Sequence, residues 1–105
     1  MDYQSAVAKA AGERYELVLY IAGTTPQSSA AVETLSEVCK QYMSGRYELI
    51  VVDVYQEPAR ARRDQVIAVP TLVKRSPKPS RRFVGDLSDR SKLLNGLDLA
   101  AGVGG

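Results

Sequence analysis

The fold is decided by residues 15–26, which read YELVLYIAGTTP. The first seven residues of this stretch are rich in apolar and β-prone side chains and end at Ala22-Gly23, which predicts a buried strand. Residues 24–26 then supply a hydroxyl cap and place Pro26 at the first helical position, where no backbone N–H is needed. The stretch therefore predicts a strand that leads directly into a helix.

Helix and strand signals alternate after this stretch. The first helix carries apolar residues at helical spacing until Gly45 stops it, namely Ala31, Leu35, Val38 and Tyr42. Residues 47–54 are mostly β-branched and predict a second strand. Pro58 opens a second helix that is expected to run to about Val66.

The second half of the chain predicts a hairpin and a last helix. Residues 72–73 and 82–84 read as short paired strands, with prolines marking the turn between them. Ser88 is expected to cap a helix that ends in the glycine-rich residues 102–105. The predicted order is βαβαββα, an α/β class with the thioredoxin arrangement, in which a right-handed parallel unit is followed by an antiparallel hairpin.

Length and composition indicate one globular domain. The chain has 105 residues, of which 45% are hydrophobic and 25% are charged. We expect a flexible leader over 1–14, a domain over 15–101 and a glycine-rich tail over 102–105. No apolar run is long enough to cross a bilayer and residues 1–11 do not resemble a signal peptide, so a cytoplasmic protein without membrane contact is expected.

The cysteine and histidine content limits the kinds of catalytic and metal site that this chain can hold. The chain has no histidine, which excludes a Ser-His-Asp triad and a zinc site. We expect no metal, no cofactor and no catalysis by this chain, and the family resemblance given below implies the same. A thioredoxin-type enzyme holds a reactive cysteine at the start of its first helix, but residues 22–28 read AGTTPQS. Cys39 lies about three turns further on and is expected to pack in the core. A redox protein that uses Cys39 is the alternative hypothesis.

Charge is distributed unevenly along the chain. Residues 1–54 hold four basic and seven acidic side chains, a net charge of −3, whereas residues 55–105 hold ten and five, a net charge of +5. A basic half suits an acidic partner surface or nucleic acid, and it also suits a solvated face. Only Phe83 accompanies the densest basic cluster, so nucleic-acid binding, which needs several stacking aromatics, is not expected.

Local signals conflict in the second half of the chain. Gly96 falls inside the predicted last helix, where glycine costs about 1 kcal/mol relative to alanine. Residues 97–99 alternate as a strand would, and residues 66–69 are β-prone beside a helix. These conflicts predict either a frayed helix or a functional region, and Gly96→Ala is expected to favour the helical form.

Five segments in register resemble the KaiB family. They read LYIAGTTP at 19–26, VDV at 52–54 followed by Pro58, AVPTL at 68–72, RRFVGDLSDR at 81–90 and KLLNGLDL at 92–99. The resemblance covers about residues 15–100. A KaiB-like sensory domain cut from a histidine kinase is a further hypothesis, which the short chain argues against.

This resemblance implies a metamorphic clock protein. Family members rest in a βαββααβ fold, usually as a tetramer, and a rarer monomer adopts the thioredoxin-like order. That monomer binds the N-terminal ATPase ring of hexameric KaiC and regulates its phosphorylation cycle, and in some systems KaiA or a histidine kinase is then captured. Two packings of one sequence must differ by only a few kcal/mol for such a switch.

The resemblance also implies which residues carry this function. The KaiC-binding set lies around the second helix and its exit, at Arg63, Asp64, Gln65, Val66 and Ile67, with Lys74 and Arg81 nearby. The fold-switch set is Pro70, Pro77, Pro79, Gly96 and Asp98. The chain departs from cyanobacterial members at Ala30, Ile50 and Gln65 and in residues 102–105, which favours a system that uses KaiC alone or with a third partner other than KaiA.

Overall fold

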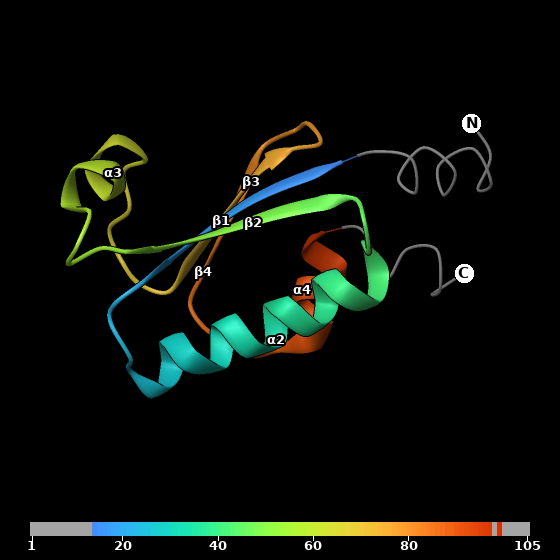
Figure 1. The fold of residues 1–105 in the computed structure, drawn as a ribbon, viewed down its shortest axis with the longest axis horizontal. Helices are drawn as coiled ribbons and strands as arrows, with labels where there is room; N and C mark the ends of the chain where they lie inside the picture. Colours follow the sequence, from blue (N-terminus) through green and yellow to red (C-terminus); the bar gives the residue numbers. More distant parts are fainter. Residues whose placement is uncertain (1–13, 98, 100–105) are drawn as a thin grey trace.

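The computed structural model describes residues 14–97 and Leu99. Asp98, the tail at 102–105 and all of the predicted leader except Arg14 lie outside the described residues. The elements are β1 (Tyr15–Ile21), α2 (Pro26–Tyr42), β2 (Tyr47–Asp53), α3 (Pro58–Arg63), β3 (Thr71–Ser76), β4 (Arg81–Val84) and α4 (Arg90–Gly96) (Figure 1). The predicted order βαβαββα is confirmed.

The four strands form one mixed sheet in the order β2-β1-β3-β4. β1 and β2 pair in parallel, from Tyr15 opposite Tyr47 to Ile21 opposite Asp53. β3 pairs antiparallel with both β1 and β4. The predicted parallel unit and antiparallel hairpin are both present, and the pairing of β1 with β3 joins them.

Side chains alternate across β1 and build a core on each face of the sheet. Leu17 and Leu19 belong to the cluster covered by α2 and α4, whereas Val18 and Tyr20 belong to a smaller cluster with Ala61 of α3. Figure 1 shows α2 and α4 along one side of the sheet and α3 at one end. Because α3 has only six residues, no helix from residues 14–97 covers much of the second face.

The start of α2 is closed by hydroxyl groups. The Thr25 side chain accepts a hydrogen bond from the Ser28 backbone N–H at 3.2 Å, and the buried Ser28 hydroxyl accepts one from Ala22 N–H at 3.1 Å. These bonds satisfy donors at the helix start and fix the turn after β1. The predicted cap before Pro26 is confirmed.

Two predicted helix boundaries are wrong. α3 ends at Arg63 rather than Val66, because Gln65 adopts a left-handed backbone with φ of 56° that a helix cannot continue. α4 is capped by Asp89, whose carboxylate accepts a hydrogen bond from Lys92 N–H at 3.2 Å. The expected cap, Ser88, instead donates its backbone N–H to Asp86 at 3.0 Å.

α4 also ends earlier than predicted. Its last residue is Gly96, which therefore does not lie in the helix interior. A Cβ at Gly96 would overlap Cε1 of Phe83 and lie 3.0 Å from Cζ of the same ring. This contact argues against the expectation that Gly96→Ala favours this helical form, because the ring occupies the space that the methyl group needs.

Candidate partner-binding site

The segment that follows α3 turns back sharply and leaves one apolar side chain in solvent. Gln65 N–H donates to Arg62 at 3.0 Å and Val66 N–H donates to Ala61 at 2.9 Å, which is the paired closure of a Schellman motif. Val66 then packs on the cluster that holds Ala61. Ile67, the next residue, is 97% exposed, so the turn projects an isoleucine away from the core.

Asp64 fixes this turn to the sheet. Its carboxylate accepts hydrogen bonds from the Tyr20 hydroxyl on β1 and from Arg75 Nη2 on β3, the latter at 2.7 Å. Arg82 on β4 donates to the backbone oxygens of Asp64 and Gln65 at 2.6 and 3.0 Å. Burial raises the pKa of Tyr20, and its bond to Asp64 raises it further. Three strands thus hold the exit of α3 in place.

The exposed part of the site combines cationic and apolar groups. Arg63, Gln65 and Ile67 are exposed, whereas Asp64 and Val66 are half-buried. An exposed isoleucine and an exposed arginine on one turn suit a protein partner, since burial of the apolar side chain adds affinity and the charge adds orientation. The structure therefore brings five of the implied binding residues together in one turn.

The other two implied binding residues lie elsewhere. Lys74 pairs in register with Leu17, so it points to the α2 face, and it is only 2% exposed. Arg81 pairs with Lys74 and donates to the Gly96 carbonyl at 3.3 Å. The expectation that these side chains lie near the α3 exit is wrong, because adjacent strand residues face opposite sides of a sheet.

Arg82 and Tyr20 belong to the site although sequence reasoning did not select them. Strand alternation contains the signal for Arg82: it pairs with Val73, whose side chain lies in the α3 cluster. The hydrogen bond from Tyr20 to Asp64 joins residues 44 positions apart, and no local sequence pattern predicts it. The site therefore rests partly on long-range contacts that only the fold supplies.

The implied fold-switch residues are dispersed over the second half. Pro70 is buried before β3, and Pro77 and Pro79 lie in the β3–β4 turn. All three follow cis peptide bonds. Gly96 closes α4 against Phe83, and Asp98 lies outside the described residues.

Cys39 is placed as a core residue. It is fully buried, and burial raises the pKa of its thiol to about 11. Because the thiolate is the nucleophile, such a thiol is unreactive near neutral pH. The alternative hypothesis of a redox protein that uses Cys39 is disfavoured by this position.

Residues 14–97 and Leu99 contain neither a metal-binding cluster nor a membrane-spanning helix. No group of three or more acidic or cysteine side chains gathers there in a way that holds a metal ion. Within the same residues, no helix has the length and apolar character to span a membrane.

These features define a thioredoxin-like domain whose first helix begins without a cysteine. Among solved structures, the thioredoxin Deadhead of Drosophila melanogaster superposes with a TM-score of 0.68 at 20% identity, covering 91% of this chain and 89% of its own. The N-terminal domain of SasA from Synechococcus elongatus gives 0.66 at 23% identity, covering 83% and 86%. These likenesses show the fold.

Sequence comparison supplies the family. The KaiB domain model matches residues 18–99. The circadian clock oscillator protein KaiB of Prochlorococcus marinus strain MIT 9515 is 50% identical over 90 residues, covering 86% of this chain and 83% of its own. The KaiB of Trichodesmium erythraeum is 51% identical over 85 residues, covering 81% and 82%. The chain belongs to the KaiB family of circadian clock proteins.

Proposed function

We propose that this chain is a cytoplasmic clock component that binds the N-terminal ATPase ring of a hexameric KaiC-type protein and regulates its phosphorylation cycle. The observation that carries the proposal is the α3 exit, where Ile67 is 97% exposed on a turn that the rest of the fold holds rigidly. A preorganised turn loses little conformational freedom when it binds. The thioredoxin-like form is the state that we propose to bind.

The chemistry of the turn supports a protein partner rather than a small substrate. Its exposed groups are an isoleucine and arginines, which suit an apolar pocket with acidic surroundings on another protein. We propose no catalytic activity for this chain. We also propose that a resting form of different topology does not bind the ATPase. Self-association to a dimer or tetramer would belong to that resting form.

The experiment is size-exclusion chromatography with the KaiC-type ATPase of the same genome, in ATP or ADP, followed by affinity measurements on variants. Ile67→Ser should weaken binding by about ten- to a hundredfold, since burying such a side chain contributes roughly 1.5–3 kcal/mol. The matched control is Val51→Ser. Val51 lies on the other face of β2, is 42% exposed and pairs with Leu19. Equal affinities for the two variants would contradict the proposed site.

A further inference from the structure

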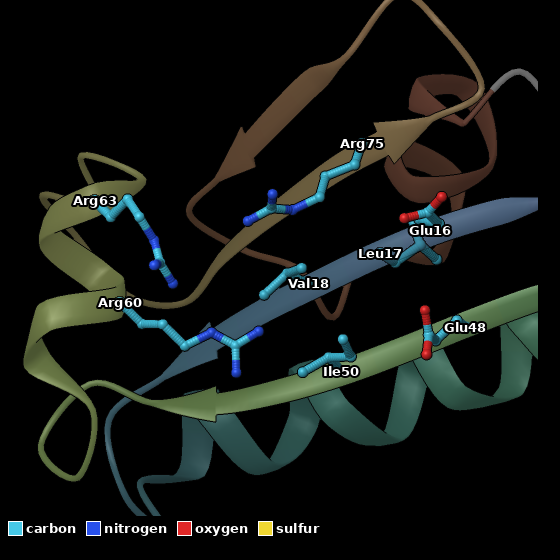
Figure 2. A pocket seen from close by; sticks show the side chains of 8 residues that line it. All are labelled: Glu16, Leu17, Val18, Glu48, Ile50, Arg60, Arg63 and Arg75. Carbon is cyan, nitrogen blue, oxygen red and sulfur yellow. The ribbon is translucent and has the colours of Figure 1, made fainter.

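A second surface feature lies beside the α3 exit, on the part of the sheet that α3 leaves open. It is a hollow of about 250 Å³ between α3 and the strands β1, β2 and β3 (Figure 2). Its floor is Val18 and Ile50, which are register partners on β1 and β2. Its rim is charged, and the two ends of the rim have opposite signs.

The end near α3 is cationic. Figure 2 shows the guanidinium groups of Arg60 and Arg63 from α3 and of Arg75 from β3 directed toward the same space. Arg75 is paired with Asp64 at 2.7 Å and Arg60 lies 3.6 Å from Glu57. The guanidinium of Arg63 makes no hydrogen bond or ion pair with the described part of the chain, so this end carries excess positive charge.

The opposite end is anionic. Glu16 and Glu48 are direct partners in the parallel β1–β2 register, and both are exposed. Like charges placed directly opposite each other destabilise a sheet. Within the described residues neither carboxylate has a basic partner; Glu16 accepts only a 3.4 Å hydrogen bond from Ser76. This end of the hollow therefore presents two exposed carboxylates to a cationic side chain of a partner.

We propose that this hollow docks one segment of the same ATPase partner, and the inference therefore rests on the proposed function. That segment presents a carboxylate to the arginines, an apolar side chain to the floor and a lysine or arginine to Glu16 and Glu48. The hollow is continuous with the α3 exit because Arg63 belongs to both. The recognition surface thus includes acidic as well as basic side chains. A partner surface that is acidic throughout does not match the end formed by Glu16 and Glu48.

A second copy of this chain is a poorer occupant of the hollow. The charges of two copies would match if one were turned end to end, but stable dimers need more than about 1,000 Å² of well-packed surface. Val18 is only 3% exposed. Stacking the hollows of two copies against each other would therefore remove little apolar area from water. Charge complementarity with a single partner segment therefore explains the hollow better.

The test is the affinity of the double variant Glu16→Gln/Glu48→Gln for the ATPase hexamer, measured by interferometry. Its control is Glu33→Gln/Glu37→Gln on α2, an exposed pair on the opposite face of the sheet with the same change in charge. The hollow variant should bind about five- to tenfold more weakly than the wild type, and the control should stay within about twofold. The difference should shrink at about 0.5 M salt because screening weakens exposed charge pairs.

Unfolding of the free variants separates docking from a structural role. Removing two opposed like charges should leave the hollow variant at least as stable to urea as the wild type, so weaker binding would then report a lost contact. Unchanged affinity of the hollow variant, with Ile67→Ser still impaired, would overturn this inference and leave the proposed function standing. A wild type that does not bind the ATPase would overturn both.

Discussion

Replacing Gly96 with alanine tests how tightly α4 packs on the hairpin. Helix propensity alone favours alanine by up to about 1 kcal/mol, and less at the last helical residue, where Gly96 stands. The added methyl group would overlap Cε1 of Phe83 and lie 3.0 and 3.1 Å from Cζ and Cδ1. Overpacking of this kind costs roughly 1–3 kcal/mol. The net expectation is a loss of about 1 kcal/mol in the free energy of unfolding.

The Phe83 ring has limited freedom to move aside. It packs against the larger core cluster, and the Arg81 guanidinium lies 6.0 Å from its centroid on the exposed side. Rotating the ring would therefore disturb both the core contact and the cation–π contact. The clash should appear as destabilisation rather than as a small local adjustment.

A double-mutant cycle isolates the contact. Leucine at Phe83 lacks the ring atoms that meet the new methyl group, so Gly96→Ala should be neutral or stabilising in the Phe83→Leu background. Urea unfolding of the four proteins should give a coupling energy of about 1–2 kcal/mol. A Gly96→Ala variant that gains about 1 kcal/mol in both backgrounds would refute the packing and restore the propensity prediction.

Three further predictions concern the α3 exit and the core. Gln65→Gly should raise the free energy of unfolding by about 1 kcal/mol, because Gln65 has φ of 56° and glycine adopts that conformation without strain. Urea unfolding measures this change, and the control is Gln56→Gly, which lies in a turn that needs no positive φ. A loss of stability in Gln65→Gly would contradict the prediction. Tyr20→Phe should destabilise the fold by about 1–2 kcal/mol, since Asp64 loses a donor, and should increase amide exchange of residues 64–67; unchanged exchange would show that the bond does not hold the turn. Cys39, whose pKa burial raises to about 11, should resist a thiol reagent at pH 8 until the chain unfolds. Because its thiol ionises more readily in the unfolded chain, the wild type should lose stability relative to Cys39→Ala as the pH rises from about 9 to 11, and parallel pH profiles would argue against a buried thiol.

The first half of the fold could be predicted closely because its signals are local and consistent. Strand residues 15–21, the hydroxyl cap and Pro26 agree with each other, and the structure follows them. The end of α3 could not be predicted because it depends on Gln65, a residue type with no special preference for positive φ. α4 ends at Gly96, whereas the sequence predicts that it continues into the glycine-rich segment.

The candidate site could be predicted only where its residues are contiguous in the sequence. The turn at 63–67 is contiguous, so the family resemblance implies it as one unit and the structure keeps it together. Lys74 was misplaced and Arg82 was missed because both depend on strand register. The charge pairing of Glu16 with Glu48 likewise becomes visible only when β1 and β2 are aligned.

Two tyrosine hydroxyls of β1 connect the halves of the chain and bear on the proposed switch. Tyr15 donates to the Leu97 carbonyl at 3.2 Å and Tyr20 donates to Asp64. Each such bond contributes about 0.5–1.5 kcal/mol net, and about 1.5–3 kcal/mol when the acceptor is charged. Refolding the second half would break both bonds and leave the β1–α2–β2 unit intact, since that unit has its own register and its own helix cap. Their combined contribution is a few kcal/mol, which is the size of the free-energy difference expected between two packings of one sequence in the switch that the family resemblance implies.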